Sequence, residues 1–151
     1  AASESSMPES SDERISNLSK IMDISLLKGI KEEDIFIDPL IFPISVASNY
    51  GNDALEAIKK IRNIWPKVNI TGGMSNISFG LPKRRLINDV FIHLAIKNGA
   101  NSGIINPIES KLDRIINMDQ NVNQFKITKN MLEGNDEFCT EYLSAYRKNK
   151  L

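Results

Sequence analysis

The sequence has very few of the residues that build disulfides, metal sites or histidine-based catalytic sets. Its 151 residues include one cysteine, Cys139, and one histidine, His93. A single cysteine cannot form an internal disulfide, so it gives no sign of an oxidising compartment. No cysteine–histidine spacing resembles a metal site, and one helical histidine cannot support a Ser-His-Asp set. We expect His93 to pack rather than to catalyse, and we expect no metal in this chain.

An excess of charge and a long apolar run are also missing. The 19 Lys and Arg residues balance 19 Asp and Glu residues, giving a formal net charge of zero. Affinity for nucleic acid through phosphates needs a basic field, so a general nucleic-acid binder is not expected. No apolar run approaches the roughly 20 residues that cross a bilayer. The polar start, residues 1–11, is expected to be a loop and does not resemble a signal peptide. We therefore expect a cytoplasmic protein without a membrane contact.

The glycine pair at positions 72 and 73 is not a nucleotide-binding motif. The pair lacks the G-x-G-x-x-G spacing, and no Gly-Lys-Ser/Thr follows it. Glycines directly after a strand nevertheless let a ligand approach the backbone closely. The nearby side chains offer amide, hydroxyl and carboxylate groups. These groups suit a neutral heterocycle better than a polyphosphate.

Short apolar runs alternate with amphipathic segments along the chain. Fully apolar strands between helices are typical of a parallel sheet covered by helices. A doubly wound sheet and a (β/α)8 barrel both fit, and both place function at the carboxyl ends of the strands. The spacing predicts helices near residues 11–28, 53–64, 84–97, 109–117 and 135–147, and strands at 35–37, 68–71 and 102–105.

Polar residues follow each predicted strand in turn: Asp38, then Ser75 and Asn76, then Asn106. Each alone could simply cap a turn, but three at equivalent positions predict a site. Residues 83–85 (Lys-Arg-Arg) begin a predicted helix, where the helix dipole disfavours cations. They form either a solvated surface triplet or a group in which an arginine binds a carboxylate-bearing ligand. We expect Cys139 and the aromatic residues, Trp65 and those of the tail, to lie in the core.

Residues 73–78 (GMSNIS), Arg84 and residues 86–88 (LIN) resemble the signature of a known family. It is the family of pterin-binding methyltetrahydrofolate:corrinoid methyltransferases. This group includes the corrinoid/iron–sulfur protein methyltransferase and the folate domain of cobalamin-dependent methionine synthase. Residues 34–40 are similar to the family's strand that ends in Asp-Pro-Leu, and residues 98–107 are similar to its next helix end and strand.

The resemblance implies an α/β fold, a TIM (β/α)8 barrel with parallel strands alternating with helices. Residues 1–151 would be a partial barrel domain, the C-terminal half, containing about the last four α/β steps. A second chain or an N-terminal half would complete the barrel. The implied reaction moves the N5-methyl group of methyltetrahydrofolate to cob(I)alamin on a corrinoid protein or domain.

The resemblance also implies roles for individual residues. Asn76 matches the asparagine near N5 of the pterin and is the predicted catalytic residue. Asp38 matches an aspartate that hydrogen-bonds the pterin, while Gly73 and Ser75 frame this contact. Arg84 is a candidate for binding the benzoyl-glutamate tail.

Two alternatives remain open from the sequence. The chain could be a non-catalytic half-barrel that dimerises or docks a corrinoid protein. The related dihydropteroate synthases fit less well, because the Ser-Asn-Ile-Ser run matches the methyltransferases better. One departure is Phe79, which stands where some family members have glutamine.

Overall fold

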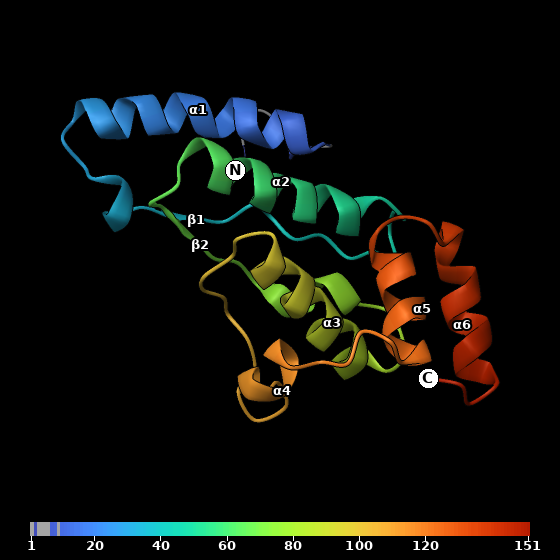
Figure 1. Cartoon of the computed structure of the whole chain (residues 1–151). Coiled ribbons are helices and arrows are strands. Elements are labelled where there is room, and N and C mark those ends of the chain that lie inside the picture. Colours follow the sequence, from blue (N-terminus) through green and yellow to red (C-terminus); the bar gives the residue numbers. More distant parts are fainter. Residues whose placement is uncertain (1, 3–6, 9) are drawn as a thin grey trace.

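The computed structural model describes residues 2, 7–8 and 10–151 of the chain. The loop expected over residues 1–11 therefore lies partly outside the described residues. Figure 1 shows a mostly helical molecule around a small sheet. No helix among the described residues is long and apolar enough to cross a membrane. The elements are the helices α1 (Ser11–Leu27), α2 (Tyr50–Ile64), α3 (Arg84–Lys97), α4 (Leu112–Ile116), α5 (Asn123–Leu132) and α6 (Thr140–Arg147), the strands β1 (Phe36–Ile37) and β2 (Asn69–Ile70), and the 3₁₀ turns η1 (Glu32–Asp34), η2 (Met74–Ser78) and η3 (Glu137–Cys139).

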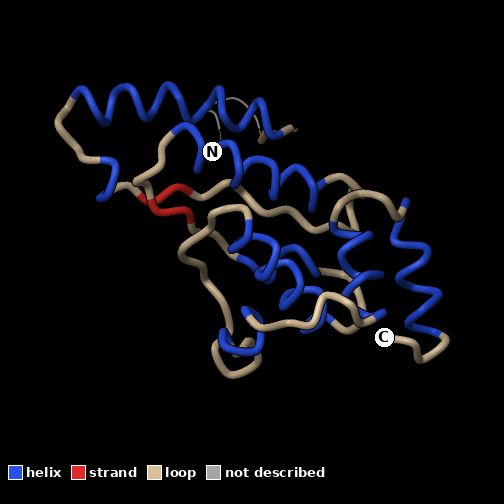
Figure 2. The backbone as a smooth tube through the Cα atoms, viewed as in Figure 1, coloured by secondary structure: helices blue, strands red, loops and turns tan. Residues whose placement is uncertain are grey.

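The sheet is parallel, as predicted, but it is smaller than predicted. β1 and β2 pair side by side (Figure 2). The expected third strand runs along β2, where the Ile104 N–H donates to the Gly72 carbonyl at 2.9 Å. Within the described residues its one bridge pairs Ile104 with Gly73, so it does not form a full strand. The side-chain oxygen of Asn101 takes the Ile70 N–H at 2.8 Å, which replaces a ladder bond. The parallel α/β class is confirmed, whereas the half-barrel stays a prediction.

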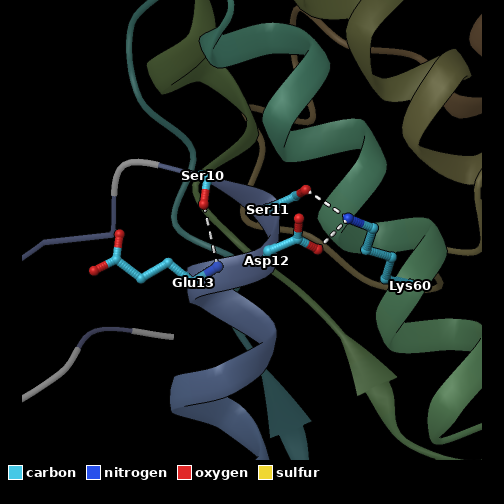
Figure 3. Close-up of polar contacts among 5 residues, drawn as sticks. All are labelled: Ser10, Ser11, Asp12, Glu13 and Lys60. Carbon is cyan, nitrogen blue, oxygen red and sulfur yellow. Dashed lines mark hydrogen bonds and ion pairs between the residues drawn. The ribbon is translucent and has the colours of Figure 1, made fainter.

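The start of α1 is fixed to α2 by polar contacts. The polar residues before this helix predict a cap at Ser11 or Asp12, but Ser10 caps it instead by accepting the Glu13 N–H at 3.2 Å. Lys60 of α2 donates to the Ser11 hydroxyl at 2.9 Å and to the Asp12 carboxylate at 2.6 Å (Figure 3). These contacts set the position of the first turn of α1 against α2.

Helix α3 is the centre of the core and carries the histidine. All of its residues 87–95 are buried, and it contacts α2, α4, α5 and η2. His93 donates from Nδ1 to the Ile115 carbonyl at 2.8 Å, and its ring meets the Phe125 ring edge-on at 5.5 Å. The predicted packing role of His93 is confirmed.

The tail differs from its prediction in two ways. Helix α5 was not predicted, and α6 begins at Thr140 instead of near 135. The Asp136 carboxylate caps α6 by accepting the N–H groups of Glu141 and Tyr142, both at 2.9 Å. Because of this cap, α6 starts later in the chain than the apolar pattern predicted.

The tail aromatics do not all lie in the core. Phe138 has a positive φ of 54° and is 79% exposed, so its predicted core position is wrong. Trp65, Tyr142 and Cys139 are buried, as predicted. Burial raises the pKa of the Cys139 thiol to about 11, which keeps it protonated at neutral pH.

Gly51 marks the closest approach of two helices and gives a stability prediction. A Cβ at this position would lie 2.3 Å from the Leu132 carbonyl oxygen of α5, a backbone atom that cannot rotate away. We expect Gly51→Ala to lower the free energy of unfolding by about 2–3 kcal/mol, because α2 and α5 must separate. Urea denaturation checks this, with the exposed Glu56→Ala in the same helix as control. Equal midpoints for the two variants would contradict the close contact.

Candidate functional site

The carboxyl ends of the parallel segments meet at one edge of the molecule. Asp38 follows β1, and Gly72 and Gly73 follow β2 after one threonine. A Cβ on Gly72 would lie 3.1 Å from Oδ1 of Asp38. The aspartate therefore rests against the backbone of the glycine pair. Glycine suits position 72 because a side chain there would crowd the carboxylate.

Asp38 is held by the turn that it begins. Its Oδ1 accepts the Leu40 N–H at 2.8 Å, and Leu40 has a left-handed backbone with φ of 62°. The side chain is exposed, so the carboxylate is oriented by the turn and still reachable from solvent. The turn-capping role that the sequence left open is thus present, and it is compatible with ligand binding.

Asn76 lies on the turn η2, directly above Gly73. A Cβ at Gly73 would be 3.1 Å from Nδ2 of Asn76, and the Asn76 N–H donates to the Gly73 carbonyl at 3.0 Å. The side chain is exposed, and within the described residues its amide makes no hydrogen bond. The amide is therefore fixed at its base by η2 and has its own hydrogen-bonding groups available for a ligand.

Arg84 turns back from the start of α3 onto the same turn. Its Nε donates to the Ser78 hydroxyl at 3.0 Å, and its Nη2 donates to the Ser75 carbonyl at 3.1 Å. The guanidinium also lies over the Phe79 ring, 5.8 Å from its centre. Arg84 is thus an ordered part of the loop, which favours the ligand-binding alternative over a solvated triplet. Its neighbour Arg85 instead lies 3.9 Å from Asp89.

A polar cavity of about 480 Å³ opens beside this loop. This volume falls in the range of small-molecule sites. Three residues selected from the sequence line it: Ser75, Arg84 and Asn106. The wall also contains residues that sequence reasoning missed, chiefly Asn88 and Ser110. Asn88 lies one turn after Arg84 on the same helix face, and this spacing was the available signal.

An ion pair fixes the far wall of the polar cavity. The buried Asp89 carboxylate accepts a hydrogen bond from Arg114 of α4, which also donates to the Glu109 carbonyl at 3.2 Å. Burial raises the pKa of Asp89, while Arg85 and the Ser110 hydroxyl oppose that shift. The pair holds the loop of Glu109 and Ser110 against α3.

The site therefore offers a carboxylate, a free amide and a cation in order along one edge. Asp38 and Asn76 lie at the strand ends, and Arg84 continues into the polar cavity. No group of three or more His, Cys, Asp or Glu side chains in the described part of the chain is arranged to hold a metal ion. Such a set can hydrogen-bond a flat heterocycle and bind an anionic extension of it.

Comparison with known proteins agrees with this chemistry. The family model described as "Pterin binding enzyme" matches residues 3–106, which include every site residue predicted from the sequence. Methylcorrinoid:tetrahydrofolate methyltransferase of Eubacterium limosum is 33% identical over 117 residues, covering 78% of this chain and 40% of that protein. Methionine synthase of Mycobacterium tuberculosis is 37% identical over 91 residues, covering 56% of this chain and 8% of that protein. The chain spans less than half the length of either relative, and it belongs to the family of pterin-binding enzymes, as the motif of residues 73–88 predicted.

Proposed function

We propose that the protein binds methyltetrahydrofolate and transfers its N5-methyl group to cob(I)alamin carried by a corrinoid protein or domain. The supporting observation is the placement of Asp38 and Asn76 against the adjacent glycines 72 and 73. The name of the Eubacterium limosum relative describes transfer in the reverse sense, from a methylcorrinoid to tetrahydrofolate. The same residues serve both directions, because forward and reverse reactions share one transition state.

The proposed role of Asn76 follows from the chemistry of the leaving group. A neutral tertiary amine leaves poorly, so N5 must gain a proton from solvent before its bond to the methyl carbon breaks. The protonated N5 donates to the amide oxygen of Asn76. When the bond breaks, its electron pair stays on N5 and the methyl group moves without it. The corrinoid supplies the cobalt(I) nucleophile that accepts the methyl group.

The amide of Asn76 suits both states of the ring nitrogen. It carries an oxygen acceptor and an NH₂ donor, so a rotation lets it follow N5 from donor to acceptor. Asp38 accepts hydrogen bonds from N–H groups of the pterin and fixes the ring over Gly73. Ser75 frames the ring through the backbone of η2, which Arg84 holds.

Arg84 has a second proposed role, which gives a specific prediction. Its Nη1 makes no hydrogen bond within the described residues, so it can bind a carboxylate of the benzoyl-glutamate tail. We expect Arg84→Met to weaken binding of methyltetrahydrofolate by about tenfold, as the loss of one charged hydrogen bond implies. Binding of a methyltetrahydropterin without the tail should change much less. Equal losses for both ligands would show that Arg84 only supports the loop.

The exposed edge beyond Ile104 supports a further part of the proposal. An apolar cavity of about 300 Å³ lies there, with Met74, Ile92 and Ile105 in its wall. Ile104 is 71% exposed and Ile108 is 80% exposed. Parallel sheets are normally covered on both faces, so we propose that another part of the protein, or a second chain, completes the barrel along this edge.

Calorimetry with methyltetrahydrofolate tests the proposed function. We expect saturable heat with the intact protein, reduced by Asp38→Asn. No heat from either the intact protein or the chain mixed with a barrel-completing segment would contradict it. Binding of a corrinoid protein without any pterin heat would instead support the non-catalytic docking module.

A further inference from the structure

Arg14 of α1 is a buried cation close to the Asp38 turn. Its side chain is fully buried, although α1 is an outer helix (Figure 1). Its Nε donates to the Pro39 carbonyl at 2.7 Å, and its Nη2 donates to the Leu40 carbonyl at 3.3 Å. The guanidinium lies 5.3 Å from the centre of the Phe42 ring. Arg14 thus binds the backbone of the two residues that follow Asp38.

These bonds reach the Asp38 carboxylate through a single residue. Leu40 donates its N–H to Oδ1 of Asp38, while its carbonyl accepts from Arg14. Leu40 holds a left-handed φ of 62°, which a leucine rarely adopts without support from its surroundings. Arg14 supplies that support, because it bonds the Pro39 carbonyl before the Leu40 nitrogen and the carbonyl of Leu40 itself.

Packing alone does not explain a charge at this position. Burial lowers the pKa of Arg14, so the ionised side chain is disfavoured there, and the Asp53 carboxylate only partly offsets this. One of its nitrogens, Nη1, has no hydrogen-bond partner within the described residues. An apolar side chain would fill the space without leaving a donor unpaired. Lys60 ties the first turn of α1 to α2 (Figure 3). Arg14 belongs to that first turn and bonds the Pro39 and Leu40 carbonyls.

We propose that Arg14 is a positioning residue for ligand binding. Through the Leu40 turn it fixes the direction of the Asp38 carboxylate and does not touch the pterin itself. This inference rests on the proposed function for Asp38. It predicts that replacing Arg14 both loosens the Leu40 turn and weakens pterin binding.

The experiment compares Arg14→Met and Arg14→Lys with Arg62→Met in the intact protein. Arg62 is the matched control, because it also clamps a backbone carbonyl, that of Gly99, with bonds of 3.0 and 2.9 Å. We expect Arg14→Met to speed amide hydrogen exchange at Leu40 about tenfold and to weaken methyltetrahydrofolate binding about tenfold, with partial rescue in Arg14→Lys. Arg62→Met should alter neither value, whatever it does to the urea midpoint.

A double-variant cycle separates positioning from general stability. In an Asp38→Asn background, Arg14→Lys should no longer change pterin affinity, since the group that it orients has been altered. Additive losses would overturn the proposal, as would unchanged Leu40 exchange in Arg14→Met. Arg14→Lys also carries the test if Arg14→Met does not fold. A wild-type protein without pterin affinity would contradict the proposed function, while Leu40 exchange would still decide whether Arg14 holds the turn.

Discussion

Asn76→Ala is expected to lower the rate of methyl transfer by roughly 10²-fold or more, the usual cost of removing a preorganised polar group at a reacting centre. The amide is anchored over Gly73 by η2 and makes no hydrogen bond of its own within the described residues. It therefore has little structural role to lose. The rate is measured under single-turnover conditions, as the change in cob(I)alamin absorbance after mixing with enzyme-bound methyltetrahydrofolate.

Two comparisons make the Asn76 result specific. Asn123→Ala removes an exposed amide from the start of α5 and should leave the rate unchanged. Pterin affinity in Asn76→Ala should fall much less than the rate, because the contact strengthens as charge develops on N5. A rate within about twofold of wild type would refute the role assigned to Asn76.

Asp38→Asn is expected to weaken methyltetrahydrofolate binding by about 10- to 100-fold, the range for a lost hydrogen bond to a charged group. The variant keeps an oxygen that can accept the Leu40 N–H, so the turn should survive. The substitution therefore removes the negative charge and one hydrogen-bond acceptor that the pterin would use. Titration calorimetry gives the dissociation constant, and the rate at saturating ligand should fall less than the affinity.

The control for Asp38 is Asp23→Asn, which neutralises an exposed carboxylate on α1. It should leave pterin binding unchanged. If Asp38→Asn also left the affinity unchanged, the carboxylate would be no more than the cap of the Leu40 turn.

Helices with clear end signals in the sequence could be predicted. Helices whose ends or core faces depend on side-chain hydrogen bonds could not. α3 was placed at its observed bounds because Asn98 and Gly99 follow a strong apolar pattern. α5 was missed because Thr128 occupies a core position in it and satisfies its hydroxyl on the Gln124 carbonyl at 2.8 Å. A polar residue at a buried position interrupts the apolar spacing by which a helix is predicted.

Some residues of the site could likewise be predicted from the sequence and others could not. Asp38 and Asn76 could be predicted because each follows a strand and belongs to a recognisable motif. Arg14 could not, because its contacts join α1 to a turn 25 and 26 residues away. Asn88 belongs to the LIN run and lies one turn after Arg84, but its place in the wall of the polar cavity depends on the packing of α3 against η2. Contacts made by tertiary packing leave little trace in local spacing.

Methyl transfer by the intact protein tests the central claim most directly. Methyltetrahydrofolate and cob(I)alamin are mixed with the enzyme, and both the loss of cob(I)alamin absorbance and the formation of tetrahydrofolate are followed. We predict equal amounts of the two changes, saturation with methyltetrahydrofolate, and rates of both that are lower by roughly 10²-fold or more in Asn76→Ala. No tetrahydrofolate from the intact protein, with either free cobalamin or a corrinoid protein as acceptor, would contradict the account.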